Sequence, residues 1–223
     1  MDDLSLSAYR QIRRLIEGGT FDMGVRVREA RLARQLGLSR TPIRAALNRL
    51  ELEGLLVYEP NRGHIMATYS EDDVSEIYVC RSILESEAVR IAAERGLEPP
   101  TEASLVRLAQ EMDETIGAQG LSQDTKRSDF LALNKQFHET IYAHCANRHL
   151  LELIDRTSGL PLIIRNYFGF SDDELFRSQA DHRALLHALQ SRQADRARAL
   201  MKEHILVACE RMLHQTRPAR AAE

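Results

Sequence analysis

Polar side chains at helical spacing between residues 39 and 48 have the chemistry of a DNA reader. Arg40, Arg44 and Asn48 recur at i, i+4 and i+8, so a helix would carry all three on one face. Thr41 lies beside them, and Ser39 precedes them. Arginine can hydrogen-bond a guanine edge through two parallel bonds, while serine, threonine and a helix N-terminus can hold phosphate. The alternative is a solvated charged face on an ordinary core helix.

A second polar group lies on faces that are otherwise apolar. Asn134 and His138 share the inward face of one predicted helix, and His182 and His204 lie on the apolar faces of two others. A single inward histidine is usually a hydrogen-bonded core residue. Burying four polar side chains, however, costs about 1–3 kcal/mol each unless they are satisfied. A divalent metal would satisfy all four at once, because imidazole nitrogens suit zinc, nickel and similar ions.

The elements around residues 39–54 predict a helix-turn-helix. A helix over 29–36 ends at Gly37, and the next helix is capped by Ser39, has Pro42 in its first turn and stops at Gly54. The second helix has an apolar stripe on its other side, formed by Ile43, Leu47 and Leu50. A further helix over residues 5–17 precedes this pair.

Two short apolar runs follow, at residues 55–58 and 64–67, around a Pro/Asn/Gly turn. They predict a β-hairpin whose tip, Arg62 and Gly63, can approach a minor groove closely. The first 69 residues are therefore predicted to form a winged helix-turn-helix of three helices and a hairpin wing.

The periodicity from residue 70 to about 216 is helical, with no convincing alternating strand. We expect an all-α antiparallel bundle of six to seven helices, and a short C-terminal tail from 217 to 223. The predicted helices span residues 71–95, 101–118, 125–145, 148–157, 161–168, 172–191 and 194–214. Ser171 and Glu174 form a capping box, and Asp195 is the predicted N-cap of the last helix.

Charge is distributed unevenly along the 223 residues. Residues 1–69 hold 11 arginines, no lysine and 8 acidic residues, a balance of +3, while the remainder has a balance of −6. A basic N-terminal part on an acidic body is the pattern expected when one part of a chain binds nucleic acid.

The cysteine and hydropathy patterns exclude other classes. Cys80, Cys145 and Cys209 fit neither a disulfide framework nor a zinc-binding Cys-x-x-Cys pattern, and we expect all three to be core residues. The sequence has no apolar run of 18 residues and no signal-like N-terminus, so we expect a soluble, cytoplasmic protein with no membrane partner.

The stretch from Val25 to Gly63 resembles the DNA-binding domain of the GntR family of bacterial transcription regulators. The resemblance rests on the run Leu-Ser-Arg-Thr-Pro-Ile-Arg-Ala-Ala-Leu at residues 38–47 and the Glu-Gly-Leu that follows. It implies that Ser39, Arg40, Thr41 and Arg44 touch DNA together with the Arg62–Gly63 wing. Ala30 stands where many members have an arginine, and Arg28 or Arg31 is the candidate substitute.

Residues 70–215 resemble the FCD domain of the FadR-like branch of that family. The matching pieces are Arg81 with Glu85, Asn134-x-x-Phe-His138, His182, and Asp195 through Met201-x-x-His204. In metal-binding members of the branch, three histidines and one aspartate hold a divalent ion at the floor of an effector pocket. Asn134 occupies the position of that aspartate, so it offers an oxygen without a charge.

Arg81 falls on the inward face of its helix, where a permanent cation requires an anion. One interpretation is internal pairing with Glu85, four residues later. The other is a carboxylate effector that bridges Arg81 and the metal. Arg165, Asn166 and Tyr167 are further candidates for the wall of the effector pocket.

Together these features predict a homodimeric transcription regulator, not an enzyme, that binds double-stranded operator DNA. A small organic acid bound over zinc or nickel would control its operator affinity. Two alternatives stay open at this stage. The metal ion can itself be the signal, or the histidines can form the site of a metal-dependent enzyme with a DNA-binding head.

Overall fold

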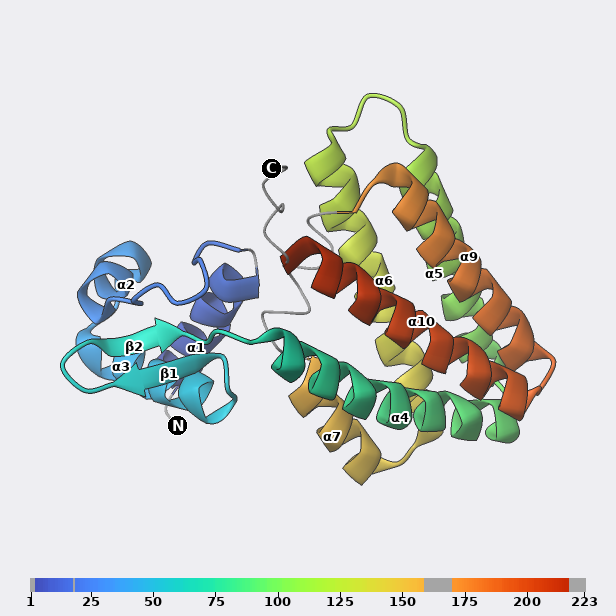
Figure 1. Ribbon diagram of the computed structural model, residues 1–223, viewed down its shortest axis with the longest axis horizontal. Coiled ribbons are helices and arrows are strands. Elements are labelled where there is room, and N and C mark those ends of the chain that lie inside the picture. The colour runs from blue at the N-terminus through green and yellow to red at the C-terminus, as the bar shows by residue number, and fades with distance from the viewer. Residues whose placement is uncertain (1–2, 18, 159–169, 217–223) are drawn as a thin grey trace, which may run out of the picture. The chain divides into compact units, whose positions relative to one another are not determined.

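The computed structural model describes residues 3–17, 19–158 and 170–216, and the chain separates into two compact units. The first unit contains the chain up to Ser70, and the second begins at Glu71. The described residues form helices and one two-stranded hairpin, as Figure 1 shows. The predicted mostly helical class, a winged helix-turn-helix followed by a helical bundle, is confirmed.

The first unit is built around an apolar core to which all three of its helices contribute. Its elements are α1 (Asp3–Glu17), α2 (Glu29–Leu36), α3 (Arg40–Leu52), β1 (Leu56–Glu59) and β2 (Gly63–Met66). Ile12, Leu32, Ile43 and Leu56 are among the core residues and are at most 1% exposed. The strands pair antiparallel, with Leu56 opposite Met66.

The turn between α2 and α3 follows the sequence prediction in most respects. Gly37 ends α2 in the left-handed region, with φ of 65°, and its backbone N–H donates to the Ala33 carbonyl. Ser39 is the extended N-cap residue of α3, but its hydroxyl makes no capping hydrogen bond. Gly54, with φ of 77°, follows the end of α3.

The second unit consists of helices in its described part. They are α4 (Glu71–Arg95), α5 (Pro99–Gly117), α6 (Gln123–Cys145), α7 (Arg148–Ser158), α9 (Asp172–Gln190) and α10 (Ala194–Thr216). Helix α10 packs along α4, and α5 packs against both α6 and α9 (Figure 1). The predicted helix at 161–168 lies outside the described residues.

Three details of the sequence prediction are wrong. The helix predicted to start at residue 101 begins two residues earlier, because Pro99 and Pro100 occupy the first positions of α5, where no N–H donor is needed. Asp195 is not the N-cap of α10, since the helix already begins at Ala194 and Asp195 lies in its first turn. Cys80 is exposed, because it lies on the outer side of α4, whereas Cys145 and Cys209 are buried. The capping box of Ser171 and Glu174 is present at the start of α9.

In the described part of the chain, we find no helix with the length and apolar character needed to span a bilayer.

Candidate DNA-binding face and metal centre

Helix α3 separates its apolar and polar residues onto different sides. Ile43, Leu47 and Leu50 are fully buried in the core of the first unit. The residues of this helix and its N-cap that are predicted to contact DNA are all exposed. They are the N-cap Ser39 and the helical residues Arg40, Thr41, Arg44 and Asn48. The helix is therefore held from behind and presents a continuous polar face to solvent.

Two of the arginines that are predicted to contact DNA, Arg44 of α3 and Arg62 of the hairpin, are each paired with a glutamate. Arg44 donates from Nε to Glu29 Oε1 at 3.0 Å and from Nη2 to Oε2 at 2.9 Å. This pairing lowers the pKa of Glu29 and raises that of Arg44, with the hydrogen bond as the largest cause in each case. Arg62, near the tip of the hairpin, donates to Glu59 at 2.5 Å. In this structure each of these two guanidinium groups is therefore engaged by a carboxylate of its own unit.

The tip of the hairpin needs residues that tolerate positive φ. Asn61 and Gly63 have φ of 67° and 77°, and the turn closes with a hydrogen bond from the Arg62 N–H to the Glu59 carbonyl at 3.1 Å. Asparagine and glycine adopt this region at low cost. The turn therefore leaves Arg62 exposed next to a small residue.

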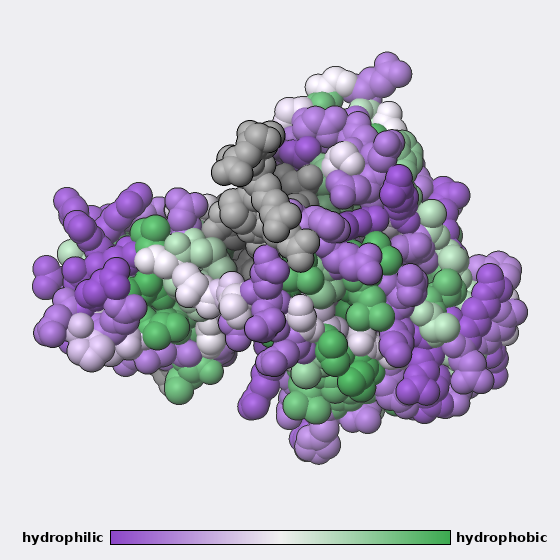
Figure 2. All heavy atoms as spheres, in the orientation of Figure 1, coloured by the Kyte–Doolittle hydropathy of each residue, from purple (hydrophilic) through white to green (hydrophobic). Residues whose placement is uncertain are grey.

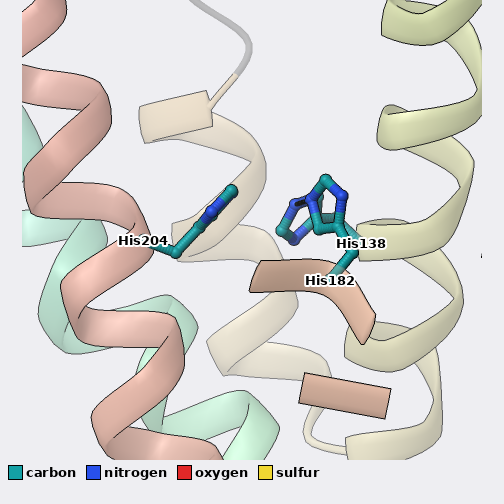
Figure 3. A group of neighbouring side chains, drawn as sticks. All are labelled: His138, His182 and His204. Carbon is teal, nitrogen blue, oxygen red and sulfur yellow. Dashed lines mark hydrogen bonds between the residues drawn. The ribbon is translucent and has the colours of Figure 1, made fainter. Parts of the chain in front are cut away.

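Three histidines converge inside the second unit. His138 of α6, His182 of α9 and His204 of α10 are 8%, 0% and 9% exposed. One ring nitrogen from each lies within 4.8 Å of the other two. Figure 3 shows the three imidazole rings pointing toward one another from their three helices.

The surroundings of His138 determine which of its nitrogens carries the proton. Tyr142 OH donates to the carboxylate of Glu85, which can only accept. The tyrosine oxygen, 3.1 Å from His138 Nδ1, must then accept a hydrogen bond from the N–H at that position. In the neutral ring, His138 Nε2 is consequently bare: it carries no proton and presents a lone pair.

The same reasoning applies to the other two rings. His182 Nδ1 lies 3.3 Å from Oε1 of Gln179, whose amide nitrogen is committed to the Ala109 carbonyl at 2.7 Å. His204 Nδ1 lies 3.2 Å from a carboxylate oxygen of Asp181. Both Nδ1 atoms therefore face acceptors and carry the proton, which leaves both Nε2 atoms bare.

Two of these bare nitrogens face each other at close range. His138 Nε2 and His182 Nε2 are 3.1 Å apart. A hydrogen bond between them would need a doubly protonated ring, yet burial lowers the pKa of both histidines well below the usual range, and the neighbouring His204 lowers them further. Two opposed lone pairs repel each other unless a cation lies between them.

The spacing of the donors fits a shared ion after a small movement. Nitrogens bound to one zinc at about 2.1 Å lie at most about 4.2 Å apart. The 3.1 Å pair satisfies this limit, and the outer bound of 4.8 Å for the group exceeds it by a fraction of an ångström that ring rotation can supply. Each ring is also fixed by an outer hydrogen bond, as is usual for metal-binding histidines.

Arg81 lies in the same interior and is bound by a carboxylate. Its Nε donates to Glu85 Oε1 at 2.7 Å, and its guanidinium carbon lies 4.8 Å from the centre of the Tyr78 ring. Burial opposes the charge of Arg81, but the attraction of Glu85 outweighs it, so the pKa is raised. The pairing with Glu85 is thus the arrangement adopted in this structure.

The comparisons with known proteins match both units. A model described as the FCD domain matches residues 76–206, and one described as bacterial regulatory proteins, gntR family, matches residues 4–65. The HTH-type transcriptional regulator YdhC of Bacillus subtilis is 31% identical over 211 residues, covering 94% of this chain and 91% of that protein. The chain belongs to the GntR family of bacterial transcription regulators.

Two further matches agree with the assignment of this chain to the GntR family. The HTH-type transcriptional repressor GlaR of Escherichia coli is 28% identical over 207 residues, covering 91% of this chain and 92% of that protein. The solved structure of E. coli McbR/YncC has a TM-score of 0.82 and covers 97% of this chain and 100% of that one, at 24% identity. The structural match shows a shared fold.

In this GntR-family protein the structure brings together some of the residues that are predicted to bind a metal. The three histidines come together, and Asn134, 5% exposed, lies one helical turn before His138 in α6. Arg165, Asn166 and Tyr167 lie outside the described residues.

Sequence reasoning missed the residues that orient the histidines. Tyr142 lies four residues after His138, and Gln179 lies three residues before His182. Both spacings place two side chains on the same side of a helix, so the sequence could have indicated these contacts. The contact between Tyr142 and Glu85 joins residues 57 apart, and that between His204 and Asp181 joins residues 23 apart. No local pattern contains these two contacts.

Proposed function

We propose that this GntR-family regulator binds a divalent metal through His138, His182 and His204, with Asn134 as a fourth donor, and senses a small organic acid there. The observation that supports the metal is the pair of bare Nε2 atoms at 3.1 Å in a buried site. When bound, a zinc or nickel ion would supply a Lewis-acid position for a carboxylate oxygen.

Other residues of the chain would orient the histidines and attract the organic acid. Tyr142, Gln179 and Asp181 keep Nδ1 of each ring protonated, so that Nε2 is available as a ligand. Arg81 supplies a buried positive charge that attracts an organic acid. An acid that reaches Arg81 would compete with Glu85, which accepts hydrogen bonds from Arg81, Ser158 and Tyr142.

The polar face of α3 and the Arg62–Gly63 wing would bind the operator, through the groove contacts to which their side chains are suited. A homodimer would place two such faces on a pseudo-palindromic site. Binding of the acid controls operator affinity only if the two states of the protein bind the acid differently.

One observation favours a second candidate function, in which the metal itself is the signal. Arg81 is already neutralised by Glu85, so the interior is balanced without an organic anion. An enzymatic role has less support: Glu139, the carboxylate next to His138 in the chain, has a 62% exposed side chain and lies 3.9 Å from Lys135.

Metal analysis and thermal shift together test this proposal. We expect purified protein to contain about one equivalent of metal, and the double variant His138→Ala, His182→Ala to contain almost none. The matched control is His187→Ala with His214→Ala, which removes two exposed histidines. Equal metal in both double variants would show that the site is misassigned.

Candidate carboxylic acids are then screened by thermal shift with and without chelator, since a ligand stabilises the folded state in proportion to its binding. An acid that stabilises only metal-loaded protein and changes operator affinity supports the organic-acid function. Loss of operator binding on chelation without any acid would support the metal-responsive function instead.

A further inference from the structure

The segment that precedes α2 lies beside the hairpin as a third line of extended backbone. Arg26 makes an isolated antiparallel bridge with Ile65 of β2. Next to this bridge, the Val27 N–H donates to the His64 carbonyl at 2.8 Å. Backbone hydrogen bonds therefore fix Arg26 along the edge of β2, although it lies more than 30 residues earlier in the chain.

This pairing directs the side chain of Arg26 toward the tip of the hairpin. In an antiparallel pair, a long side chain can reach the residue two positions along from its direct partner, and for Arg26 that diagonal neighbour is Gly63. A Cβ placed on Gly63 would lie 3.8 Å from Nη2 and 4.0 Å from Nε of Arg26. The guanidinium group therefore lies against the glycine of the Arg62–Gly63 wing, which has no side chain to keep it away.

Arg26 has no carboxylate partner in the part of the chain that the structure describes. Its side chain is exposed, and no acidic residue occurs from 23 to 28. Glu59, on the other strand of the hairpin, accepts from Arg62. Arg26 therefore differs from Arg44 and Arg62, each of which must leave a carboxylate before its bound donors can contact another group.

The surroundings of Arg26 suit an anion that lies outside the protein. The backbone is still extended at Arg28, which is also exposed, so the two arginines lie on the same side of this segment. Figure 2 shows hydrophilic residues over the end of the first unit that holds the hairpin tip, at the left of the view. A permanently charged guanidinium group on a fixed backbone is well suited to bind phosphate.

We propose that Arg26 is a further DNA-contacting residue of this regulator and binds a backbone phosphate beside the groove that the Arg62–Gly63 wing enters. The inference deepens the proposed function and rests on its assignment of the wing to operator binding. Arg26 supplies position and affinity, whereas the exposed residues of α3 supply sequence specificity. Phosphate contacts carry no direct sequence information, so the contribution of Arg26 is the same on any duplex.

The position of Arg26 along the wing favours phosphate over a base edge as its partner. The guanidinium group lies beside Gly63, the first residue of β2, and not in the turn at residues 60–62. When that turn enters a groove, a group at its base reaches the phosphates that border the groove. Binding there breaks no internal ion pair, so the whole charge of Arg26 is available to release counterions from the DNA.

The test compares two arginine-to-alanine variants of the full chain. Arg26→Ala removes the proposed contact, while Arg10→Ala removes an equal charge from an exposed position of α1, a helix to which we assign no DNA contact. The probes are a duplex selected from a random pool with the unchanged protein and an unrelated duplex of equal length. Fluorescence anisotropy at several salt concentrations gives the affinity for each duplex and its dependence on salt.

We expect Arg26→Ala to weaken binding to both duplexes by the same factor, about 5- to 10-fold for each bound copy of the chain at about 0.1 M salt. The slope of log affinity against log salt concentration should become shallower by about 0.9 per copy, because one phosphate contact is lost. Arg26→Gln should show the same losses, whereas Arg26→Lys keeps the charge and should retain most of the affinity. Arg10→Ala should leave both quantities nearly unchanged, with equal circular dichroism for all variants.

The outcomes separate this inference from the proposed function. An unchanged protein that binds no DNA would overturn operator binding and this inference with it. If Arg44→Ala weakens operator binding while Arg26→Ala changes neither affinity nor salt slope, only the role of Arg26 is overturned. A loss confined to the selected duplex would mean that Arg26 reads bases, and an equal loss in Arg10→Ala would mean that net charge alone matters. Either result contradicts a phosphate contact by Arg26.

Discussion

Arg44, which we propose contacts DNA, forms an ion pair with Glu29 in this structure. The pair lies on the surface, with side chains 63% and 28% exposed, so it adds little to stability. Two hydrogen bonds to the Glu29 carboxylate occupy Nε and Nη2 of Arg44, so a DNA base or phosphate that uses these donors must displace Glu29. Glu59 holds Arg62 of the wing in a comparable way.

This arrangement predicts opposite effects for the two members of the pair. Arg44→Ala should weaken specific operator binding about 5- to 150-fold, because a base-edge contact is lost. Glu29→Gln should tighten operator binding a few-fold, because the carboxylate competes with DNA for Arg44 and repels phosphate. Fluorescence anisotropy at several salt concentrations measures both effects.

Glu114→Gln, an exposed change of equal charge on α5, is the control and should leave affinity unchanged. Unchanged affinity in Arg44→Ala would remove Arg44 from the DNA-binding face. Weaker binding in Glu29→Gln would mean that the carboxylate positions Arg44 for DNA instead of competing with it.

At this scale, the sequence predicted residues that follow a helical period and missed those that meet only in the folded chain. His138 was placed with Asn134 because four residues make one turn of a helix. Its convergence with His182 and His204 was a hypothesis from three apolar faces. Glu85 was considered only as a partner for Arg81, whereas it also accepts from Tyr142 and thereby orients His138.

Among the elements, the turn between α2 and α3 depends most on one residue. Gly37 has φ of 65° and open space where a side chain would lie, so a substitution there acts through backbone strain alone. Gly117, the last residue of α5, also has open space but lies within a helix. The two glycines therefore allow conformation to be separated from packing.

We predict stability changes of opposite sign for the same substitution. Gly37→Ala should lower the free energy of unfolding of the first unit by about 1 kcal/mol, since alanine in the left-handed region is strained. Gly117→Ala should raise the free energy of unfolding by up to about 0.5 kcal/mol, since alanine favours the helix. Urea denaturation followed by circular dichroism measures both, and a stabilising Gly37→Ala would contradict the argument.

Element boundaries were predictable where a local signal acts alone. The capping box at Ser171 and the glycine at 37 fixed the adjacent helix ends, because capping depends on neighbouring residues. The predicted start of α5 was two residues late because proline is found both after the ends of helices and in their first turn. Cys80 was wrongly predicted to be a core residue. Helix α4 has apolar residues on both sides, so hydrophobic periodicity does not distinguish its inner side from its outer side.

For the whole molecule, the two units divide charge and function. The first 69 residues carry the positive balance, and the acidic remainder contains the buried histidines. Sequence composition located this division, because formal charge does not depend on the fold. It did not predict that Val79 and Ile83 are exposed, because their exposure follows from how α4 packs against α7 and α10.

The last prediction tests whether Ile83, a 59% exposed residue of α4, contributes to the proposed homodimer and so to operator binding. A dimer that contacts two half-sites gains affinity because the second contact is intramolecular, an effect of about 100-fold or more when the geometry matches. Ile83→Glu should therefore weaken binding to a two-half-site operator by about that factor and leave the weak affinity for a single half-site unchanged. The operator is first selected from a random DNA pool with the unchanged protein, and Phe176→Glu, the same kind of change at a 56% exposed residue of α9, serves as the control. Ile83→Glu that binds the full operator with unchanged affinity would show that the dimer contact lies elsewhere or that binding does not require a dimer. An equal loss on half-site and full site would instead indicate damage to the DNA-binding unit, which circular dichroism and the half-site control detect independently.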